Sequence, residues 1–436
     1  MSLKDLLREN EQTSGAPLRV GLVGAGQMGT GLISQIEKMV GMRIVAVADV
    51  IPNRAKMAYQ EASVDPSIVV QEENDPLKAG KLIEQGKRIA SHSSELIVNI
   101  PEIDVLVECT GIPEVGAVVC HQAILAGKHI VNMNVETDCT VGFYLAKMAQ
   151  TTGNVYTLTT GDEPGTLKEL YDFADALGFE IVSVVKGKNN PLDPSANPDT
   201  LAARAKAVNA SAKMLASFVD GTKTMVEMTS IGNGIGYVPD VRGAHGPQVA
   251  LKDLAKVYVP KTDGGIMSQK YVVDYAVGDI APGVFIIITT DQPKIIADLR
   301  YLKVNGHGNY WALYRPYHLC NLETPIAIAR AYLYGEVTLN TLRPPVAETI
   351  AIAKRDLKTG EKIDYLGGYT VYGCIEKAKI TQREGLVPLG ISVGATVIKD
   401  IKKGEPLHYD EVELDENQTI FHLRKLQDKM VASSTH

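Results

Sequence analysis

Hydrophobic positions in the first third of the chain form short apolar runs separated by segments with helical spacing. An apolar run at residues 18–24 leads into a helical pattern at about 27–40, and a second apolar run follows at 43–48. Strands buried on both faces of a parallel sheet read as continuous apolar runs of this kind. The order of strand, helix and strand therefore predicts a right-handed βαβ unit.

The same alternation continues to about residue 160. Further strands are expected at 104–108, 129–133 and 155–159, with a helix-compatible segment at 115–125. Strands that alternate with helices build a parallel sheet covered by helices on both faces. The pattern predicts that residues 1–160 form a doubly wound, Rossmann-type nucleotide domain.

After Gly178 the pattern becomes mixed, and we predict an α+β catalytic and oligomerisation domain at residues 161–345. Its expected elements are a strand at 180–186, a polar loop at 187–198, helices at about 200–218 and 222–231, and strands at 284–289, 299–304 and 310–317. The pair Pro344 and Pro345 marks a boundary. A third domain, small and β-rich, is expected at 346–436, where the K-x-G-E turn occurs twice, at 358–361 and 402–405.

Composition narrows the possible functions. The chain has 436 residues, enough for two or three domains, and 44 Lys plus Arg against 51 Asp plus Glu give a net charge of -7. Without a dense basic stretch, this balance argues against a nucleic-acid partner. Five cysteines without a C-x-x-C pair favour reduced thiols. The charged N-terminus has no apolar signal region and no segment is apolar over a membrane's thickness, so we expect a cytoplasmic protein without membrane contact.

The first βαβ unit carries a G-x-G-x-x-G motif between its strand and its helix. Gly24 allows the tight turn, Gly26 lets the backbone approach a pyrophosphate, and Gly29 brings helix and strand together. The backbone of Gln27 and Met28 opens the helix, whose N-terminus favours negative charge. This context predicts dinucleotide binding.

The choice between NAD and NADP is left open by the residues around the second strand. Asp49, directly after that strand, is suited to accept hydrogen bonds from a ribose 2'-hydroxyl and favours NAD. Arg54 and Lys56 are suited to neutralise a 2'-phosphate and favour NADP.

A second turn is expected to line the nicotinamide half of the cofactor. Cys109, Thr110 and Gly111 follow a predicted strand at the carboxyl edge of the sheet, where ligands of open α/β sheets bind. The alternative is an ordinary turn between a strand and a loop.

Three segments together resemble the homoserine dehydrogenase superfamily over about residues 18–235. They are the glycine motif, the Glu108-Cys-Thr-Gly111 turn and the Ala126-Gly-Lys-His-Ile-Val-Asn-Met-Asn134 segment. The block at about 346–416 resembles a SAF domain, a small β-clip module. The combination is similar to deoxyxylulose 5-phosphate reductoisomerase-like proteins.

This resemblance implies an NADPH-dependent reductoisomerase that converts 1-deoxy-D-xylulose 5-phosphate to 2-C-methyl-D-erythritol 4-phosphate in isoprenoid biosynthesis. It also implies a phosphorylated small-molecule substrate, a cofactor contact at Asn134 and a homo-oligomer.

The chain departs from the homoserine dehydrogenase pattern in two places. The A-N-K turn of that superfamily reads Asn134-Val-Glu136 here, without the lysine, and its G-x-D-x-x-x-K helix appears with acid and base exchanged at Lys223 and Glu227. An alternative function is therefore an NAD(P)-dependent dehydrogenase of the homoserine dehydrogenase type, acting on a small polyol, sugar acid or homoserine-like compound. A further alternative is a nucleotide-sensing scaffold without catalysis.

The strand at 180–186 ends in a cluster of cations and amides. Lys186, Lys188, Asn189 and Asn190 provide groups that can polarise a carbonyl, hold a phosphate and move a proton. We predict that Lys188 and Asn189 contact the reacting oxygens; the alternative is a solvated polar turn.

Lys223 and Glu227 are four residues apart and share a helix face. We predict that Lys223 orients the substrate and that Glu227 handles a proton. A plain helix salt bridge is the alternative.

Asp162 and Glu163 follow the last strand of the nucleotide domain. As substrate-binding residues they are candidate ligands for Mg²⁺ or Mn²⁺, with Glu136 as a third, although a helix N-cap explains Asp162 equally well. The metal ligands therefore stay unknown, and no Cys/His spacing indicates zinc.

Arg242 and His245 occupy a glycine-rich loop that can close on a substrate, though a lone histidine is more often structural. His318 has the same two interpretations. Arg204 and Lys213 are either phosphate partners or solvent-facing charges.

Overall fold

The computed structural model describes residues 2–71, 73–208 and 210–434, which form two compact units. Unit 1 contains Met1–Asp162 and Leu319–Leu342, and unit 2 contains Glu163–His318 and Arg343–His436. The end of the first segment at Asp162 lies beside the boundary expected at residue 160. The finer division of unit 2 into a catalytic and a C-terminal domain stays a prediction.

Unit 1 is built on a parallel sheet of seven strands in the order β3-β4-β2-β1-β5-β6-β7. Its strands are β1 (Leu18–Val23), β2 (Met42–Ala48), β3 (Val69–Gln71), β4 (Arg88–Ser91), β5 (Val105–Glu108), β6 (His129–Asn132) and β7 (Tyr156–Leu158). The chain order reverses between β1 and β5, which creates the crevice where doubly wound sheets bind ligands. The predicted Rossmann-type α/β fold is confirmed.

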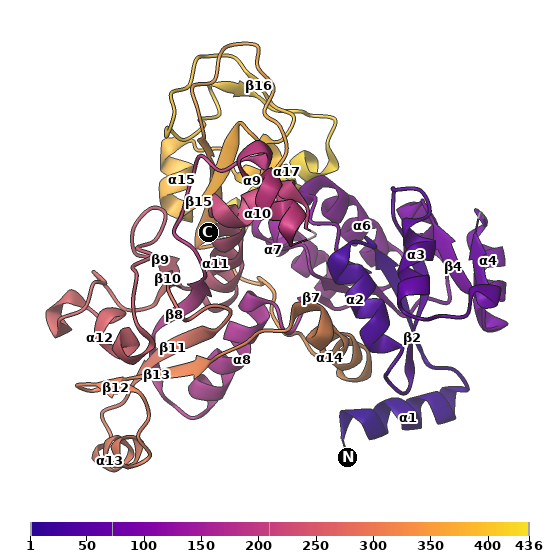
Figure 1. The fold of residues 1–436 in the computed structure, drawn as a ribbon, viewed down its shortest axis with the longest axis horizontal. Coiled ribbons are helices and arrows are strands. Elements are labelled where there is room, and N and C mark those ends of the chain that lie inside the picture. The colour runs from indigo at the N-terminus through magenta and orange to yellow at the C-terminus, as the bar shows by residue number, and fades with distance from the viewer. Residues whose placement is uncertain (1, 72, 209, 435–436) are drawn as a thin grey trace. The chain divides into compact units, whose positions relative to one another are not determined.

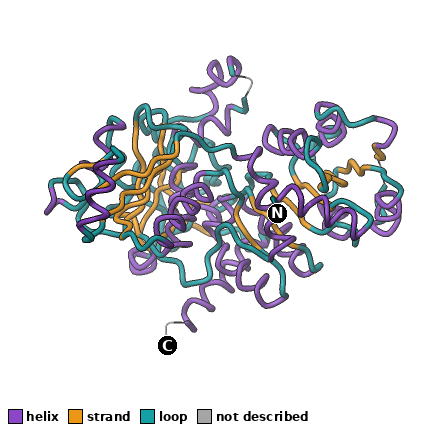
Figure 2. The backbone as a smooth tube through the Cα atoms, turned by 90° about the horizontal axis from the view of Figure 1, so that it is seen from below, coloured by secondary structure: helices purple, strands orange, loops and turns teal. Residues whose placement is uncertain are grey.

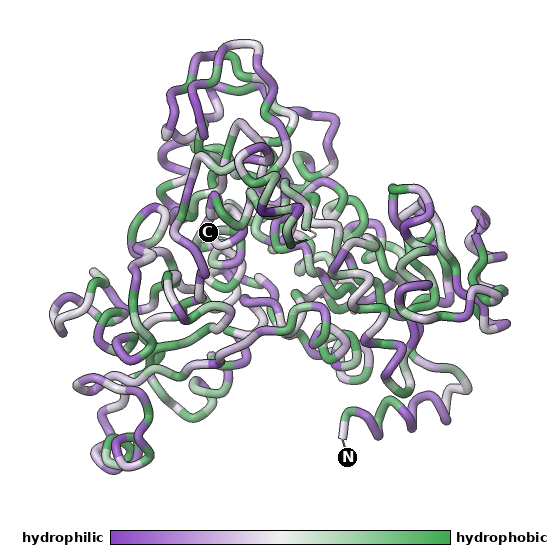
Figure 3. The backbone as a smooth tube through the Cα atoms, in the orientation of Figure 1, coloured by the Kyte–Doolittle hydropathy of each residue, from purple (hydrophilic) through white to green (hydrophobic). Residues whose placement is uncertain are grey.

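Helices connect these strands, as the alternating pattern predicted. They are α1 (Leu3–Ser14), α2 (Gln27–Ile36), α3 (Arg54–Glu61), the short η1 (Pro66–Ile68), α4 (Pro76–Glu84), α5 (Ser94–Asn99), α6 (Pro113–Leu125) and α7 (Val135–Thr152). Apolar side chains of β1 and β2 pack against α2 in one buried core. In Figure 3 hydrophobic positions follow the strands, whereas the positions of α1 are mostly hydrophilic.

The chain returns to unit 1 through α14 (Cys320–Tyr334), which no pattern in the sequence indicated. Ala327 and Ile328 of this helix join the core formed by α2 and β1. A side chain at Gly31 of α2 would lie 2.0 Å from Nδ2 of Asn321, so the two helices are in close contact. Farther on, the N–H of Leu158 donates to Leu339 O at 2.8 Å.

Unit 2 contains a mixed sheet of six strands in the order β12-β13-β11-β8-β10-β9, which lie side by side in Figure 2. They are β8 (Glu180–Lys188), β9 (Val238–Pro239), β10 (Val272–Val277), β11 (Val284–Thr289), β12 (Gly306–His307) and β13 (Tyr310–Arg315). β8 pairs with β10 in parallel and with β11 in antiparallel orientation. β8 is therefore a central strand, and its two cationic residues, Lys186 and Lys188, are buried.

The helices of this part of unit 2 differ from the sequence prediction in two places. They are α8 (Glu163–Ala176), α9 (Pro198–Ala207), α10 (Ala212–Val219), α11 (Thr222–Ile235), η2 (Leu251–Asp253), α12 (Leu254–Val257), η3 (Lys261–Asp263) and α13 (Pro293–Tyr301). The single helix expected at 200–218 is wrong, because Ser211 caps a new helix by accepting from Met214 N. The strand expected at 299–304 is also wrong: α13 begins at Pro293 and its exposed end includes Tyr301.

α8 and α11 pack against the six-stranded sheet (Figure 1). The segment around α12 contributes a second contact, in which the Tyr258 ring meets Phe285 of β11 edge-on at 5.2 Å between centroids. Together these contacts hold β8 and α11 side by side in the middle of the unit.

The C-terminal block contains two antiparallel strand pairs, as the predicted small β region required. Its elements are β14 (Ala347–Ala353), β15 (Val371–Lys377), α15 (Ala378–Glu384), α16 (Leu389–Ser392), β16 (Thr396–Val397), β17 (Val412–Glu413) and α17 (Thr419–Ser434). The K-x-G-E turns are confirmed: Glu361 and Glu405 each accept from the backbone N–H three residues earlier, and both glycines have positive φ.

Two other expectations concern the thiols and the membrane. The cysteines at 109, 120, 139, 320 and 374 form no disulfide bond in the described part of the chain. Among the helices formed by the described residues, none combines the length and the apolar character that a membrane span requires.

Candidate functional site

The glycine turn of unit 1 has the geometry of a dinucleotide-binding loop. Gly24 has φ +102°, and a Cβ at Gly29 would lie 2.1 Å from Gly24 O, so both glycines are required by the fold itself. A Cβ at Gly26, in contrast, would have no protein atom within 4 Å. No side chain caps the N-terminus of α2 at Gln27 and Met28, which leaves that end suited to an anion.

Asp49 stands at the carboxyl end of β2, next to this turn. Its Oδ2 accepts from Ala25 N at 2.8 Å and its Oδ1 from Ile51 N at 2.9 Å. Nη1 of Arg54 lies 3.9 Å from Oδ2. The carboxylate expected to favour NAD is thus held in place by the same backbone that forms the glycine turn, and a cation that favours NADP lies beside it.

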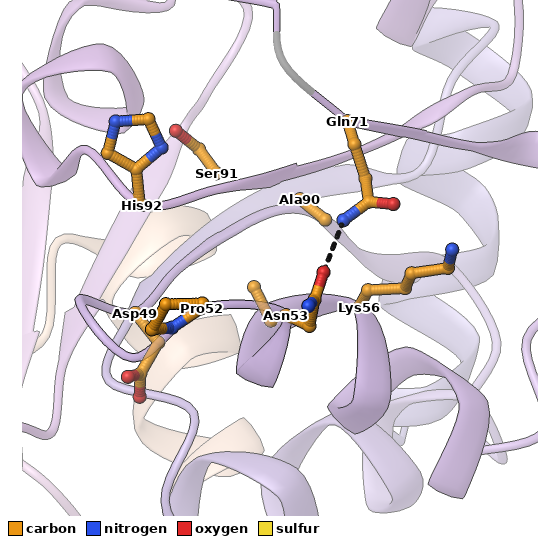
Figure 4. A pocket seen from close by; sticks show the side chains of 9 residues that line it. Asp49, Pro52, Asn53, Lys56, Gln71, Ala90, Ser91 and His92 are labelled. Atoms are coloured by element: carbon orange, nitrogen blue, oxygen red, sulfur yellow. Dashed lines mark hydrogen bonds between the residues drawn. The ribbon is translucent and has the colours of Figure 1, made fainter.

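A cavity of about 220 Å³ continues from Asp49 toward β3 and β4. Figure 4 shows Asn53, Lys56, Gln71 and His92 around it, with Gln71 donating to Asn53 Oδ1 at 3.4 Å. Lys56 was named beside Arg54 from the sequence, but Gln71 and His92 were missed. Gln71 is the last residue of β3 and His92 follows β4, and only the sheet order brings them to this cavity.

The turn after β5 borders the switch point of the sheet. Burial raises the pKa of Glu108 to about 7, although the N–H and hydroxyl of Thr110 donate to its Oε1. Sγ of Cys109 donates to Gly24 O at 2.9 Å, and Gly111 has φ +66°. Cys109 and Thr110 are therefore in contact with the loop and strand that the sequence prediction assigned to the cofactor.

Asn134 is the N-cap of α7. Its Oδ1 accepts from Thr137 N at 3.1 Å and its Nδ2 donates to Ile112 O at 3.1 Å. These bonds join α7 to the loop after β5, so the side chain has a structural part whether or not it also contacts a cofactor. Glu136 lies in the first turn of the same helix.

Unit 2 contains a second cavity, of about 450 Å³, at the end of β8. We call it the β8 pocket. Its lining includes five of the ten residues that the sequence predicted for catalysis and substrate binding, and the full set is Glu163, Lys186, Gly187, Lys188, Asn189, Asn190, Arg204, Leu215, Phe218, Val219, Thr224, Ala281, Pro282 and His318. The apolar side of the pocket, from α10, was not predicted.

Lys186 is fixed between two carboxylates. Its Nζ donates to Glu163 Oε1 at 2.8 Å and to Glu227 Oε2, and all three side chains are largely buried. Burial acts to lower the pKa of Lys186, but the two carboxylates outweigh it and raise the pKa above its ordinary value. Lys186 is thus a permanent cation that cannot serve as a proton donor near neutral pH.

Glu227 carries the titratable proton of this cluster. Burial first, and the neighbouring Glu163 second, raise its pKa to about 7. Lys223 lies on the same helix with Nζ 3.9 Å from Glu227 Oε1. The pair at 223 and 227 therefore faces the charge cluster and is more than a surface salt bridge.

Lys188 differs from Lys186 in its surroundings. Burial and the nearby Lys186 cation lower the pKa of Lys188 to about 8. Its Nζ donates to the backbone oxygen of Phe218 at 2.8 Å. A lysine of this pKa in a pocket exchanges its proton close to neutral pH, which suits acid–base chemistry.

His318 closes the pocket on the side of Glu163. Its Nε2 lies 3.5 Å from Glu163 Oε2, and its Nδ1 is 2.6 Å from Pro282 O. The latter contact places the proton on Nδ1 and leaves Nε2 toward the carboxylate. Both interpretations of this histidine had been open, and its position on the pocket favours the functional one.

Two predicted substrate residues lie elsewhere in unit 2. Arg242 pairs with Glu376 at 2.7 Å and with Glu384 at 2.5 Å in the C-terminal block. Nε2 of His245 is 2.8 Å from Asp240 Oδ2. Neither side chain lines the β8 pocket. Asp162 is buried at the end of the first segment of unit 1.

The metal prediction meets an unfavourable donor set. Carboxylate oxygens of Asp162, Glu163 and Glu227 lie within 4.8 Å of one another, but two of the three carboxylates are already paired with the Lys186 ammonium. We therefore derive no step through Mg²⁺ or Mn²⁺.

Residues 161–324 match the family model described as "Oxidoreductase DRL, catalytic domain". This range covers α8, β8, α11 and the β8 pocket. No curated protein matches the chain at a significant level.

Solved structures of several dehydrogenases share part of the fold. A candidate myo-inositol dehydrogenase from Sinorhizobium meliloti 1021 is 16% identical, over 73% of this chain and 91% of its own, with a TM-score of 0.40. Scyllo-inositol dehydrogenase from Lactobacillus casei, solved with NAD(H) and scyllo-inositol, is 15% identical over 69% and 76% with a TM-score of 0.38. Myo-inositol 2-dehydrogenase from Lactobacillus plantarum is 14% identical over 68% and 76% with a TM-score of 0.35.

At these low identities and TM-scores the similarity to the solved structures says nothing about activity. The sequence match is the more specific finding, and it identifies the segment that holds Glu163, Lys186, Lys188 and Glu227 as similar to an oxidoreductase catalytic domain.

Proposed function

We propose that the protein is an NAD(P)-dependent oxidoreductase that reduces or oxidises a small, hydroxylated, anionic substrate. The single observation that carries the proposal is the β8 pocket itself: a segment matching an oxidoreductase catalytic domain places a lysine of pKa about 8 beside a fixed charge cluster. The glycine turn of unit 1 supports the nicotinamide part, because it leaves Gly26 open and the start of α2 uncapped.

The nicotinamide cofactor, when bound, supplies or accepts the hydride. The residues that would hold its pyrophosphate are the backbone of Gly26, Gln27 and Met28, and Asp49 with Arg54 would meet the adenosine ribose. These are the residues named from the sequence, and the open position at Gly26 fits the group.

In the direction of reduction, Lys188 donates a proton to the substrate oxygen as the carbonyl carbon gains the hydride. The carbonyl becomes a hydroxyl, with the hydride that the bound cofactor would supply and the proton from Lys188, and Lys188 is left neutral, to be protonated again from solvent. Lys186, held by Glu163 and Glu227, stays charged, and its ammonium helps to lower the pKa of Lys188 so that Lys188 gives up its proton near neutral pH.

Asn189, Asn190 and Arg204 surround the outer part of the pocket and define the class of substrate. The amides can donate to hydroxyl groups, and Arg204 adds a cation that suits a carboxylate or a phosphate. These groups fit a sugar acid, a homoserine-like compound or a sugar phosphate.

A reductoisomerase acting on 1-deoxy-D-xylulose 5-phosphate is a second candidate. The Lys188 and Arg204 cations favour a phosphate, and the rearrangement requires a proton to be taken from a hydroxyl group, a part that the Glu163 carboxylate on the pocket lining can take. The charge cluster around Lys186 favours this candidate less, because two of the carboxylates that a divalent metal would need are already paired with the lysine.

The test is a set of hydride-transfer assays on the full chain, followed by the absorbance of the reduced nicotinamide. Arms contain 1-deoxy-D-xylulose 5-phosphate with and without Mg²⁺ or Mn²⁺, homoserine, small sugar acids and inositols, each with both cofactors. We expect turnover with an anionic hydroxylated compound. Turnover with the phosphate sugar would select the second candidate, and tight cofactor binding without turnover on any arm would favour a sensing scaffold instead.

A further inference from the structure

The C-terminal block reaches the wall of the β8 pocket. By the pocket wall we mean residues 189–208 and 210–219, the polar loop with α9 and α10, which supply Asn189, Arg204 and Phe218 to the lining. The block and the wall both belong to unit 2, although more than a hundred residues of chain separate them. A contact between them gives the block a direct way to affect the pocket.

Lys354, directly after β14, makes that contact. Its Nζ donates to Ala196 O at 2.6 Å and to Gly368 O at 2.8 Å, and it pairs with Asp220 Oδ2 at 2.7 Å. The side chains of Lys354 and Asp220 are only 3% and 0% exposed. Two of the three ammonium protons go to these carbonyl oxygens and the positive charge pairs with the carboxylate, so the lysine joins the polar loop, the C-terminal block and the end of α10.

Asp220 connects Lys354 to the helices beside the pocket. Its N–H donates to Ala216 O at 2.8 Å in the last turn of α10, and its Oδ1 accepts from Thr222 N at 2.8 Å at the start of α11. Two residues before it, Phe218 O accepts the hydrogen bond from Lys188 Nζ. The position of that carbonyl therefore depends on a short chain segment that Lys354 holds.

The block supports the wall at three further points. Tyr369 OH donates to Asp199 Oδ1 at 3.1 Å at the start of α9. Nζ of Lys213 in α10 lies 4.3 Å from the centre of the Tyr365 ring. A Cβ at Gly367 would lie 2.2 Å from Lys213 O, so block and helix are packed backbone to backbone. Lys213, a possible phosphate partner by sequence, thus faces the C-terminal block.

We propose that Lys354 is a positioning residue for the β8 pocket: by fixing Asp220 and the polar loop, it holds the Phe218 carbonyl where it orients the Lys188 ammonium. The inference rests on the proposed function, in which Lys188 donates a proton to the substrate. It assigns the C-terminal block a part in catalysis without contact between the block and the substrate.

The test removes the pair as a unit in the full chain. Lys354→Met alone would leave the buried Asp220 carboxylate without its cation, which destabilises a fold for unrelated reasons. The double variant Lys354→Met with Asp220→Asn avoids this, since the amide still accepts from Thr222 N. Lys399→Met with Asp410→Asn is the matched control, because that pair belongs to the same block, has an N–O distance of 2.6 Å and is exposed to solvent.

Three quantities are measured: amide hydrogen exchange by mass spectrometry, kcat and KM with the best substrate, and the Kd of the cofactor. In the double variant we expect exchange about tenfold faster or more across 189–219 but unchanged in β8. We expect kcat to fall by ~100-fold, as for other small misplacements of reacting groups. Cofactor Kd should stay within about twofold, and the control should match the wild type in all three.

Wild-type exchange across 189–219 together with wild-type kcat in a folded double variant would overturn the proposal. So would a fall in stability with kcat intact, which is the result of a purely structural pair. If the double variant does not fold, Asp220→Asn alone keeps acceptors around Lys354 and gives the same readouts, with an unchanged kcat again counting against the proposal. Absence of turnover in the wild type refutes the proposed function instead, whereas unchanged exchange refutes the positioning.

Discussion

Two lysines on one strand have opposite electrostatic surroundings, although only Gly187 separates them. Lys186 is held between Glu163 and Glu227 and its pKa is raised, whereas the pKa of Lys188 is lowered to about 8 by burial and by the Lys186 cation. Residues i and i+2 of a strand share a face, so both reach the same region. The two lysines differ in pKa because their partners differ: Lys186 pairs with carboxylates, and Lys188 donates to a backbone carbonyl.

The pH dependence of the reaction should report the Lys188 proton. Lys188 donates only as an ammonium ion, and its pKa is about 8, so the rate of reduction should fall as pH rises through about 8. Lys188→Met should lower kcat by ~100-fold or more and abolish the fall in rate near pH 8, while the cofactor Kd stays unchanged. The measurement is a pH profile of kcat at saturating cofactor, with Lys399→Met as control. A limb near 8 that persists in Lys188→Met would assign the proton to another group.

Cofactor preference should depend on the Asp49 carboxylate and the Arg54 guanidinium in opposite ways. Asp49→Ser removes a negative charge that would repel a 2'-phosphate, so the ratio of NADPH to NADH affinity should rise by about tenfold, or ~1.4 kcal/mol. Arg54→Ala should lower the same ratio. Fluorescence titration of both reduced cofactors measures it. An unchanged ratio in Asp49→Ser would leave the choice to Lys56 and the cavity beside it.

At the scale of elements, the turn between β1 and α2 contains two glycines that the fold requires and one that it does not. Gly24 and Gly29 have no room for a side chain within the protein, whereas Gly26 does. The structure agrees with the roles that the motif's spacing predicted for Gly24 and Gly29, and the contact of Gly26 with a pyrophosphate stays a prediction. Only the structure shows which substitution the fold tolerates.

Two alanine variants of this turn should behave differently. Gly26→Ala should cost the fold only a few tenths of a kcal/mol, since its Cβ meets open space, but should weaken cofactor binding by about tenfold or more. Gly29→Ala should destabilise the fold by ~1–3 kcal/mol because its Cβ would clash with Gly24 O. Urea unfolding and cofactor titration separate the two effects. Equal loss of stability in both variants would contradict the distinction.

At the scale of the whole molecule, the last helix is anchored to the C-terminal block by a buried ion pair. The Arg424 guanidinium of α17 donates to both oxygens of Glu348 in β14, at 2.7 Å and 2.9 Å. Both side chains are largely buried, at 10% and 6% exposed. A planar fork that meets a carboxylate in this way holds helix and strand in one orientation. The end of the chain is thus part of unit 2 and extends the support of β14.

Replacing only one partner of this ion pair should lower the free energy of unfolding more than replacing both. Arg424→Met leaves the Glu348 carboxylate buried without a cation and should lower the free energy of unfolding by ~3–5 kcal/mol. Adding Glu348→Gln removes that charge and should restore most of the loss. The midpoint of urea unfolding, followed by circular dichroism, measures both variants. If the double variant is as unstable as the single one, packing of the arginine stem rather than the buried charge is the cause.

The sequence by itself determined the elements and the cofactor turn. Apolar runs specify strands and the glycine spacing specifies the turn, since both depend on residues close along the chain. Two predicted elements were wrong. The helix expected at 200–218 is interrupted because Ser211 caps a new helix, and the strand expected at 299–304 is replaced by a helix that begins at Pro293.

Only the tertiary structure decided how these parts meet. Lys186 and Lys188 were recognised as a cluster, but the raised pKa of Lys186 depends on Glu163 and Glu227, which other helices bring to the strand. The return of α14 to unit 1 and the reach of Lys354 to Asp220 were likewise invisible in the sequence. Burial and long-range partners set these properties, and neither is a function of neighbours along the chain.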